Sequence, residues 1–382
     1  MAILGPRALM DIALPSGVDA SYIMRIQMED GINAAEVITL AANVIGTANE
    51  KVQQMWGGIF FETQSLWARY RAGVGSRSMT PLSAEFSIPD GVRGDDAGHM
   101  LPREDFKDGT GWSAEWLGRA NRELVNIDLD EISERWFNRC DYQIIRRMLS
   151  KAEETVGQSG YSPGWAIGTG TNSNFVPPPY MSRPFDSTHT HYKKTDAAIS
   201  ASNFGAMLDT MALELSEHGH TGPKICFFSE ANLSIVNGMA NDKKYAKFYP
   251  ASFVLNGSNT NGPVNVFPTQ PLQGVQGEIV AYYASDYGMI ELRYHPRIPA
   301  GYLWMGKSYG VNNIKNPIAI RTEKNKGFGL MVDPQMSRSM VPQLEYVLFK
   351  ATHGVGVNNR LVGVAAQIAN TGASYDEPTI AE

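Results

Sequence analysis

The strongest constraint on the fold is a long run of helical periodicity between residues 127 and 157. Apolar side chains recur every three or four residues along it, which is the spacing of one face of an α-helix. They are Leu129, Ile132, Trp136, Cys140, Ile144, Met148, Ala152 and Val156. At 1.5 Å per residue the helix would be about 45 Å long, enough for a spine on which other elements lie. We expect Asp128 and Glu131 to cap its start and Gly157 to close its end.

The stretch before this helix, residues 72–125, has the pattern of a long two-stranded excursion. Leu82 to Asp90 alternates apolar and polar side chains, which is the period of a half-buried strand. Residues 91–111 form a charged turn region, and residues 112–118 are expected to form the returning strand. An isolated hairpin is at best marginally stable in water. Since nothing nearby in the sequence offers it a surface, we expect this arm to lie on another molecule.

The remaining elements predict an α+β fold. Helices are expected at residues 32–56, 196–218 and 230–239, and strands at 223–229, 264–268, 277–296 (two strands divided at Ser285 and Asp286), 316–334 (a hairpin turning at Asn325 to Gly327), 344–354 and 359–369. Residues 158–195 are rich in Gly, Pro, Ser and Asn and are expected to form a long loop.

Composition favours a packed, acidic protein with reduced thiols. Of the 382 residues 43% are hydrophobic and 19% are charged, so a sizeable core is expected. The net charge of −6 does not suggest a sequence-independent DNA binder, which would normally carry a basic face. Cys140 and Cys226 have no C-x-x-C spacing and are expected to be buried thiols of a cytoplasmic protein. No signal peptide and no membrane-spanning stretch is recognisable in the sequence.

Residues 301–308, GYLWMGKS, match the phosphate-binding pattern G-x-x-x-x-G-K-[ST]. In a true phosphate loop small residues follow a buried strand and open a helix, so that backbone N–H groups face the anion. Here the variable positions are bulky and suit a buried strand, and the following SYGVNNIKNP does not begin a helix. We therefore interpret the match as chance. GTGTNSNF (168–175) and HGVGVNNR (353–360) are likewise interpreted as turns.

Histidines occur in two close pairs, His189 with His191 and His218 with His220. An H-x-H pair can bind zinc, and two pairs can in principle build one site. The first pair lies in an expected loop and the second at a helix end, where the helix dipole alone favours histidine. With no H-E-x-x-H and no G-x-S-x-G pattern, the sequence predicts no metal, no cofactor and no catalytic residue.

The order of these elements resembles that of the major capsid protein of tailed bacteriophages, a fold shared with encapsulins. SAEFSIPDGVRGDDAGHMLPREDF looks like the tip of the extended loop that lies across a neighbouring subunit, and PKICFFS with its flanking helices is similar to the axial domain. The resemblance implies an N-terminal arm (1–58), an extended loop with its flanks (59–126), a peripheral domain with its spine helix (127–195 and 291–350) and an axial domain (196–290 and 351–382).

The resemblance implies a non-enzymatic subunit that self-assembles into an icosahedral shell around a phage genome. Its partners would be other copies of the chain in hexamers and pentamers, and packaged DNA through non-specific contacts. Separate scaffold, portal and cementing proteins are further expected partners, and a membrane is not. The chain begins at Met1, so we expect any scaffold to be a separate protein. The location would be the virion, after assembly in the host cytoplasm.

Charged residues at the loop tip are expected to contact neighbouring subunits. They are Arg93, Asp95, Asp96, Arg103, Glu104, Asp105 and Lys107. Three alternatives stay open at this point. They are an encapsulin-like compartment protein, a metal-dependent enzyme that uses the histidine pairs, and a nucleotide hydrolase that uses Lys307.

Overall fold

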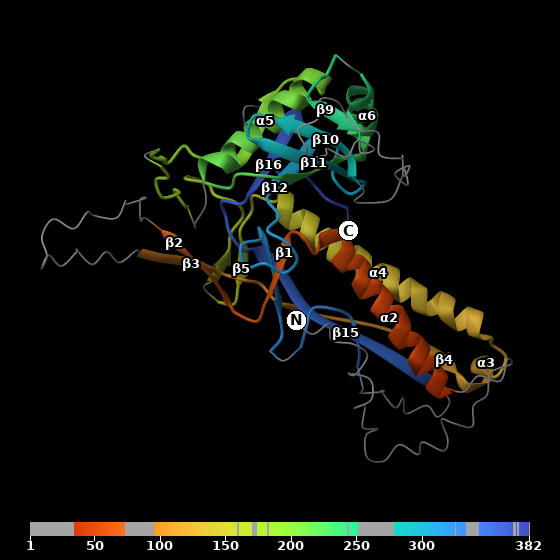
Figure 1. The fold of residues 1–382 in the computed structure, drawn as a ribbon. Helices are drawn as coiled ribbons and strands as arrows, with labels where there is room; N and C mark the ends of the chain where they lie inside the picture. Colours follow the sequence, from red (N-terminus) through yellow and green to blue (C-terminus); the bar gives the residue numbers. More distant parts are fainter. Residues whose placement is uncertain are drawn as a thin grey trace, which may run out of the picture. The chain divides into compact units, whose positions relative to one another are not determined.

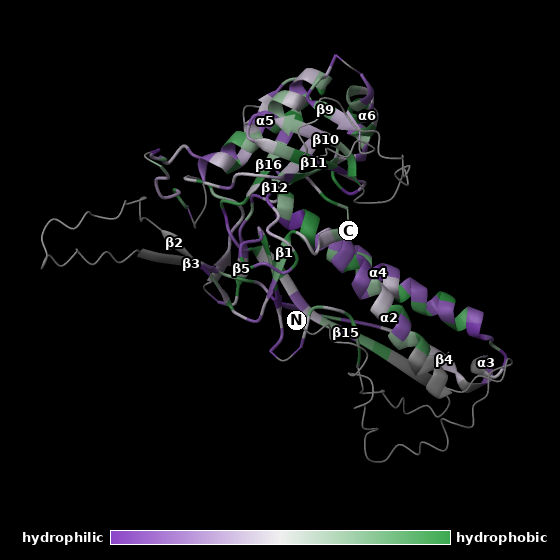
Figure 2. Ribbon diagram, viewed as in Figure 1, coloured by the Kyte–Doolittle hydropathy of each residue, from purple (hydrophilic) through white to green (hydrophobic). Residues whose placement is uncertain are grey.

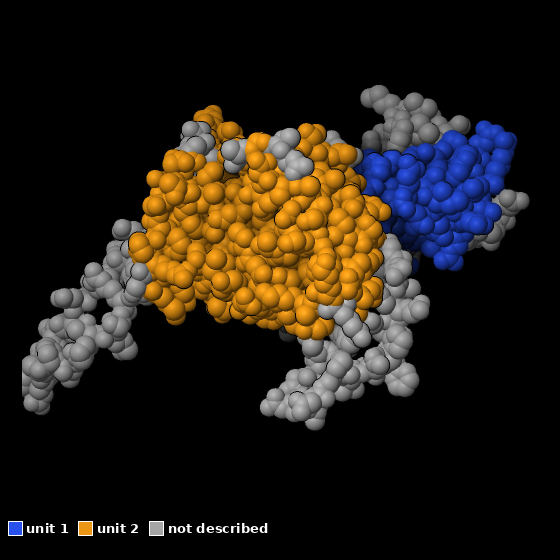
Figure 3. Space-filling model, turned by 90° about the horizontal axis from the view of Figure 1, so that it is seen from above, with its two compact units in different colours: residues 1–56, 103–141, 322–354 blue, residues 57–102, 142–321, 355–382 orange. Residues whose placement is uncertain are grey.

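The structure is a computed structural model of the 382-residue chain. It describes residues 34–72, 95–158, 160–169, 174–181, 183–242, 244–250, 279–324, 326–333, 344–369, 372 and 374–381. They fall into two compact units, coloured separately in Figure 3. Unit 1 lies within residues 1–56, 103–141 and 322–354, and unit 2 within residues 57–102, 142–321 and 355–382. Helices and strands are mixed along the chain, which confirms the α+β class.

Unit 1 combines helices with three paired strands (Figure 1). Its elements are α2 (Ala34–Trp56), β4 (Glu104–Ser113), α3 (Ala114–Leu117), the first part of α4 (Arg122–Leu149), β14 (Met331–Asp333) and most of β15 (Leu344–Val357). β15 pairs antiparallel with both β4 and β14. Its ladder with β4 runs from Leu344 opposite Ser113 to His353 opposite Glu104.

The core of unit 1 forms where α2 and α4 meet the sheet. The buried stripe of α2 consists of Ala41, Ile45, Ala48, Val52 and Trp56. Trp136 on α4 donates its indole N–H to the side-chain oxygen of Asn49 on α2 (3.2 Å). The ring of Trp136 also packs edge-on against His353 of β15, with centroids 5.1 Å apart. The apolar stripe of α4 predicted from the sequence therefore packs on α2 and on the sheet.

Helix α4 confirms the predicted spine helix but corrects its start. It begins at Arg122, where the Asn121 side chain accepts a hydrogen bond from the backbone N–H of Leu124 (3.1 Å) and caps the first turn. The predicted cap, Asp128, lies inside the helix and accepts a hydrogen bond from the indole of Trp112 (2.6 Å). In Figure 2, hydrophilic and hydrophobic residues alternate along α4, as expected of a helix with one buried face.

The end of α4 is also corrected, from Gly157 to Leu149. The last carbonyls need no glycine cap, because side chains from distant parts of unit 2 satisfy them. The indole of Trp165 donates to the carbonyl of Met148 (2.8 Å), and the hydroxyl of Tyr375 donates to that of Leu149 (2.7 Å). Gly157, with φ of 65°, lies instead between two short paired strands, β5 (Glu154–Val156) and β6 (Gly160–Ser162).

Unit 2 is centred on a seven-stranded mixed sheet with the order β7-β16-β12-β8-β11-β10-β9 (Figure 1). These strands are β7 (Tyr192–Asp196), β8 (Lys224–Ser229), β9 (Phe248–Pro250), β10 (Ile279–Ser285), β11 (Gly288–His295), β12 (Tyr302–Gly306) and β16 (Gly363–Ala369). Helices α5 (Ala201–Glu217) and α6 (Leu233–Asn241) pack against it, and a 3₁₀ turn (Glu230–Asn232) precedes α6. The hydroxyl of Ser200 caps α5 by accepting from the N–H of Asn203 (3.2 Å).

Both faces of this sheet are buried, which explains the uninterrupted apolar runs of its strands. Cys226 and Phe228 on β8 belong to the core formed with α5 and α6. Phe227 lies between them on the opposite face, where its ring centroid is 6.1 Å from that of Trp304 on β12. The predicted apolar face of α5 fills the first core with Phe204, Met207, Leu208, Met211 and Leu215.

The predicted hairpin at residues 316–334 is wrong. β13 (Ile318–Thr322) pairs in parallel with β1 (Phe60–Thr63), whereas β14 pairs with β15. Phe60 and Ile318 are register neighbours, and both are fully buried. The backbone of β13 therefore pairs with a strand that lies more than 250 residues earlier in the chain, and local turn chemistry cannot reveal that pairing.

Residues 158–195 contain β6, β7 and irregular chain, and the irregular part is held in place by two buried arginines. Arg360 donates to the carbonyls of Gly164 (3.0 Å) and Trp165 (3.2 Å). Arg147 donates to the carbonyl of Ser162 (3.5 Å), where the irregular chain begins. Trp165 itself is fully buried. Residues 162–168 of the predicted loop are therefore part of the packed interior of unit 2, whereas most of the described residues between 176 and 188 are exposed.

Most other predicted elements are confirmed within a few residues. The predicted helices 32–56, 196–218 and 230–239 are α2, α5 and α6, and the predicted strands 223–229, 277–296, 344–354 and 359–369 are β8, β10 with β11, β15 and β16. HGVGVNNR is corrected, because its first five residues continue β15. The predicted strands at 82–90 and 264–268 lie outside the described residues. β12, which the domain prediction assigned to the peripheral domain, lies in the seven-stranded sheet.

The prediction for residues 112–118 is wrong as well. Trp112 and Ser113 finish β4, and α3 follows immediately. The hydroxyl of Ser113 accepts a hydrogen bond from the backbone N–H of Trp116 (3.0 Å), so it caps a helical turn where a strand was expected.

Two further predictions concern the cysteines and membrane-spanning segments. Cys140 and Cys226 are free and buried, as expected. In the part of the chain that the structure describes, none of the helices combines the length and the apolar character needed to cross a membrane.

Candidate functional site

The predicted two-stranded excursion exists, but with different strands. β2 (Trp67–Ala72) and β3 (Asp95–Met100) pair antiparallel over six residues, from Trp67 opposite Met100 to Ala72 opposite Asp95. They form a two-stranded sheet of their own (Figure 1). Residues 73–94, which join these strands, lie outside the described residues. The excursion, now residues 67–100, is therefore centred about 15 residues earlier than the sequence pattern indicated.

The seven predicted contact residues do not share one tip. Arg93 lies outside the described residues, and Asp95 and Asp96 begin β3. Arg103 is exposed and precedes β4, which contains Glu104, Asp105 and Lys107. The residues therefore divide between the β2–β3 hairpin and the ladder of β4 with β15.

Two of the residues on β4 have partners within their own chain. Glu104 lies 3.6 Å from the guanidinium of Arg139 on α4. Asp105 accepts a hydrogen bond from Thr352 on β15 (2.7 Å), which holds the pKa of its carboxyl below the usual value. Lys107 is different, because it is exposed and stands opposite Lys350, a charge of the same sign. Arg103 and Lys107 are thus the two described members of the set best suited to meet another molecule.

Exposed apolar side chains gather near the start of α4 in unit 1. Trp116, Leu124 and Ile127 have 37%, 45% and 57% of their surface exposed. In unit 2, Val311 and Ile314 are more exposed still, on the chain that follows β12. Grouped exposed apolar side chains are typical of surfaces that meet another protein.

The GYLWMGKS segment confirms the interpretation as a buried strand. Residues 302–306 form β12 between β16 and β8, and Leu303, Trp304 and Met305 are fully buried. The ammonium group of Lys307 contacts the carbonyl of Thr221 and lies 4.7 Å from the ring centroid of Tyr309. Turns and irregular chain follow up to β13, so no helix opens here to bind a phosphate.

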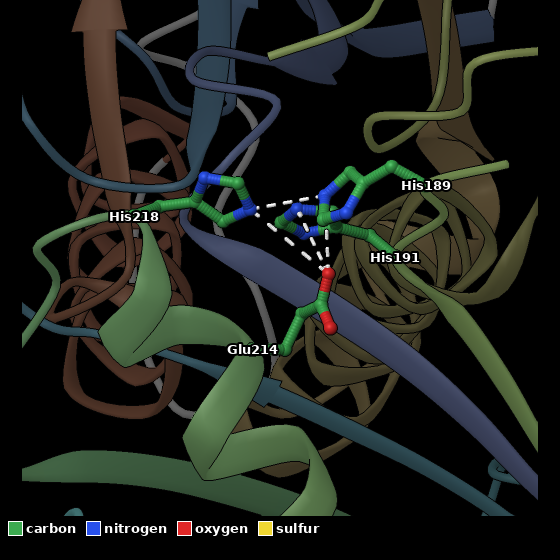
Figure 4. A group of neighbouring side chains, drawn as sticks. All are labelled: His189, His191, Glu214 and His218. Atoms are coloured by element: carbon green, nitrogen blue, oxygen red, sulfur yellow. Dashed lines mark hydrogen bonds and ion pairs between the residues drawn. The ribbon is translucent and has the colours of Figure 1, made fainter. Parts of the chain in front are cut away.

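A cluster of titratable side chains is buried in unit 2. It consists of His189, His191, Glu214 and His218, and we call it the histidine–glutamate cluster (Figure 4). His189 and His191 come from the chain just before β7, and Glu214 and His218 lie one turn apart at the end of α5. One ligand atom from each residue lies within 4.8 Å of the other three. Figure 4 shows the three imidazole rings and the carboxylate converging on one point.

The groups around the cluster orient it. The Nδ1 atom of His191 lies 2.8 Å from the carbonyl oxygen of Gly363 on β16. Because a carbonyl only accepts, Nδ1 carries the proton and Nε2 turns its lone pair to the cluster. The ammonium group of Lys193 lies 2.7 Å from Oε2 of Glu214 and leaves Oε1 facing the histidines. Phe185 covers the cluster on one side, with its ring centroid 4.4 Å from that of His218.

Burial determines the charge states of the cluster. Desolvation lowers the pKa of His189 to about 4 and that of His191 well below its usual value. Burial opposes ionisation of Glu214 too, but the neighbouring His218 ring and the charge of Lys193 outweigh it and lower its pKa to about 2. At neutral pH the cluster therefore presents a carboxylate together with two neutral imidazoles.

Sequence reasoning identified three of these four residues and missed the fourth. His220, the other half of the second pair, lies outside the cluster, and its Nδ1 is 2.7 Å from the hydroxyl of Tyr309. Glu214 was missed, although its spacing to His218 is a usable signal. Residues four apart on a helix share a face, so E-x-x-x-H on α5 can supply two ligands to one site.

Comparison with known proteins gives a fold but no sequence relative. No family model and no curated protein sequence matches the chain. A chain of Mycobacterium phage Patience is similar in structure, with a TM-score of 0.60, 17% sequence identity and 92% of each chain covered. A chain from the capsid structure of the Cyanophage P-SCSP1u has a TM-score of 0.46 and 9% identity, and the match covers 82% of this chain and 86% of that one.

The likeness to the chain of phage Patience extends over nearly the whole molecule. It confirms the fold class predicted from the order of elements, which is the capsid fold of tailed phages.

Proposed function

We propose that the chain is a major capsid protein, which self-assembles into an icosahedral shell that encloses a phage genome. The observation that carries the proposal is the fold shared with the chain of phage Patience over 92% of both chains. In such a shell the main partners are other copies of the chain in hexamers and pentamers. Separate scaffold, portal and cementing proteins complete the expected set. The chain would reach the virion after assembly in the host cytoplasm.

Features of the surface support a role in assembly. Among the described residues, β2 and β3 pair only with each other, and a two-stranded hairpin gains little stability in water by itself. Contact with a neighbouring subunit would bury the hairpin in a large interface. The exposed apolar residues Trp116, Leu124 and Ile127 are suited to the same use. A net charge of −6 suits non-specific DNA contact only if positive side chains gather on the inner face of the shell.

The proposal assigns no enzymatic activity to the chain. The nucleotide alternative requires Lys307 to reach a phosphate, but its ammonium group contacts the carbonyl of Thr221. Lys307→Ala should therefore leave shell assembly intact. A loss of tight ATP binding in Lys307→Ala, measured against a wild type that binds ATP, would revive that alternative.

The experiment that tests the proposal is negative-stain electron microscopy of the full chain, expressed alone and concentrated. Closed shells or rings of capsomers are the expected result. A uniform monomer or dimer, both alone and after coexpression with the neighbouring structural genes, would overturn it. The contents of purified particles separate the two shell functions, since nucleic acid indicates a phage capsid and a protein cargo indicates an encapsulin-like compartment.

A further inference from the structure

We propose that His189, His191, Glu214 and His218 bind one zinc ion, which fastens the segment before β7 to the end of α5. The inference concerns the subunit alone and does not rest on the proposed shell function. All four residues belong to unit 2. The side chains of His191, Glu214 and His218 are less than 10% exposed, and that of His189 is 10% exposed.

The distances within the cluster match a tetrahedral ion. With zinc–ligand distances of about 2.0–2.1 Å, tetrahedral geometry places the ligand atoms about 3.3–3.4 Å from one another. Nε2 of His189 lies 3.0 Å from Nε2 of His218 and 3.1 Å from Oε1 of Glu214. Oε1 of Glu214 lies 3.8 Å from Nε2 of His191 and 3.9 Å from Nε2 of His218. These four separations lie on both sides of the tetrahedral value, so an ion fits at the centre with small side-chain shifts.

Hydrogen bonds alone cannot satisfy the cluster. His191 turns a lone pair inward, because its proton is on Nδ1. If His218 donates to His189, the carboxylate oxygen Oε1 of Glu214 receives no proton from either ring. Nε2 of His191 and Oε1 of Glu214 are indeed buried without a hydrogen-bond partner within the described residues. Unpaired buried acceptors are costly, and a single cation at the centre would serve all of them at once.

The surroundings provide the second layer of contacts that metal sites use. A zinc-binding histidine usually donates its other ring N–H to a carbonyl or a carboxylate, as His191 does to Gly363. Glu214 is oriented in the same way by Lys193, which binds the oxygen that faces away from the histidines. These contacts hold the ligand atoms in position before any ion arrives.

The donor set selects the ion and the kind of site. Three imidazole nitrogens and one carboxylate oxygen suit zinc, whereas magnesium and calcium prefer oxygen ligands. Four protein ligands fill a tetrahedral shell and leave no position open for a water or a substrate. The site is therefore structural, and it gives no support to the alternative of a metal-dependent enzyme.

The test uses the full chain without a histidine tag, purified after dialysis against excess zinc and then gel-filtered. Metal content is measured by mass spectrometry in the wild type, in Glu214→Gln, in His218→Ala and in the matched control His220→Ala. We expect one zinc per chain in the wild type and in His220→Ala. Both ligand variants should lose zinc under the same conditions. Lys193→Met, which keeps all four ligands, should lower zinc affinity by roughly 10–100-fold.

Cobalt binding to the wild type keeps the test decisive if a ligand variant fails to fold. Four-coordinate Co²⁺ absorbs strongly in the visible, whereas six-coordinate Co²⁺ absorbs weakly. A strong visible band that zinc displaces is the expected result. The proposal is overturned if the wild type keeps no stoichiometric zinc and shows no such band. It is also overturned if His220→Ala loses as much zinc as His218→Ala.

Discussion

The hydroxyl of Tyr192 donates a hydrogen bond to the carbonyl of Ser150 (2.7 Å), one residue beyond the end of α4. The same hydroxyl accepts a hydrogen bond from the backbone N–H of Trp165 (3.0 Å). Both bonds are buried and join parts of unit 2 that are far apart in the sequence. The burial also raises the pKa of Tyr192 to about 12, so the hydroxyl keeps its proton at any physiological pH.

Tyr192→Phe should therefore destabilise the subunit without changing its shape. The ring remains, but the buried N–H of Trp165 loses its acceptor, which costs about 1–3 kcal/mol. Urea unfolding followed by tryptophan fluorescence measures the loss. Tyr161→Phe is the matched control, because Tyr161 is 42% exposed, and it should change the free energy of unfolding by less than about 0.5 kcal/mol. Equal effects of the two substitutions would contradict the structural role of the Tyr192 hydroxyl.

His353 should make unit 1 sensitive to acid. Its ring is buried among Phe106, Trp136 and Phe328, and burial followed by the charge of Arg139 lowers its pKa to about 3. Because the folded pKa lies below the unfolded value of about 6.5, the unfolded state takes up a proton first as the pH falls. The neutral ring of His353 therefore makes its full contribution to the free energy of unfolding above about pH 6.5, and this contribution is lost progressively toward pH 3. At pH 5 about 2 kcal/mol of it has been lost.

The substitution His353→Phe isolates this contribution. Neither ring nitrogen of His353 has a hydrogen-bond partner within the described residues, so an apolar ring suits the site. Urea unfolding gives the free energy of unfolding at pH 7 and at pH 5. The decrease between these two pH values should be about 2 kcal/mol smaller in His353→Phe than in the wild type. Identical losses in the two proteins would mean that His353 already titrates normally in the folded state.

Removing residues 73–94 should separate folding from assembly. A short Gly-Ser turn joining Ala72 to Asp95 keeps both strands of the β2–β3 hairpin. We expect a folded subunit with normal circular dichroism that forms no stable shells in electron microscopy. A deletion of residues 91–109 is the contrasting case, since it removes β3 and more than half of β4 and should prevent folding of unit 1. Normal shells from the first deletion would refute the role of the arm.

Assembly should also depend on the exposed charges near β4. Lys107→Ala should reduce the assembly rate in light scattering without lowering subunit stability, because it also removes the like-charge neighbour of Lys350. Lys324→Ala removes an exposed lysine outside the predicted set and should have little effect. The difference between the two should shrink in 1 M salt, where the screening length falls to about 3 Å. A difference that persists at high salt would indicate an apolar contact.

The sequence predicted the interior of the elements well, because apolar periodicity is a local property. The stripe from Leu129 to Met148 was recognised as one helix face, and the alternation around Ser285 was recognised as two strands. The errors lie at the ends of the predicted helices and strands. α4 stops at Leu149 because Trp165 and Tyr375 satisfy its carbonyls, and these residues cannot be connected to a helix end without the fold.

Strand partners were the second source of error. EDFKDGTGWS has few residues that favour strands, yet it forms β4 because β15 pairs with it along ten residues. The meeting of the four side chains in the histidine–glutamate cluster was not predicted, for a similar reason. H-x-H and E-x-x-x-H are each weak signals, and only the packing of α5 beside β7 brings them together.

The contacts at the end of α4 bear on the order in which a newly made chain can fold. The hydroxyl of Tyr375 reaches back 226 residues to the carbonyl of Leu149. The carbonyl of Leu149 can therefore find this partner only after the chain as far as Tyr375 has been synthesised. Chains that stop before Tyr375 would lack that contact, so the end of the spine helix would distinguish them from chains that contain this residue.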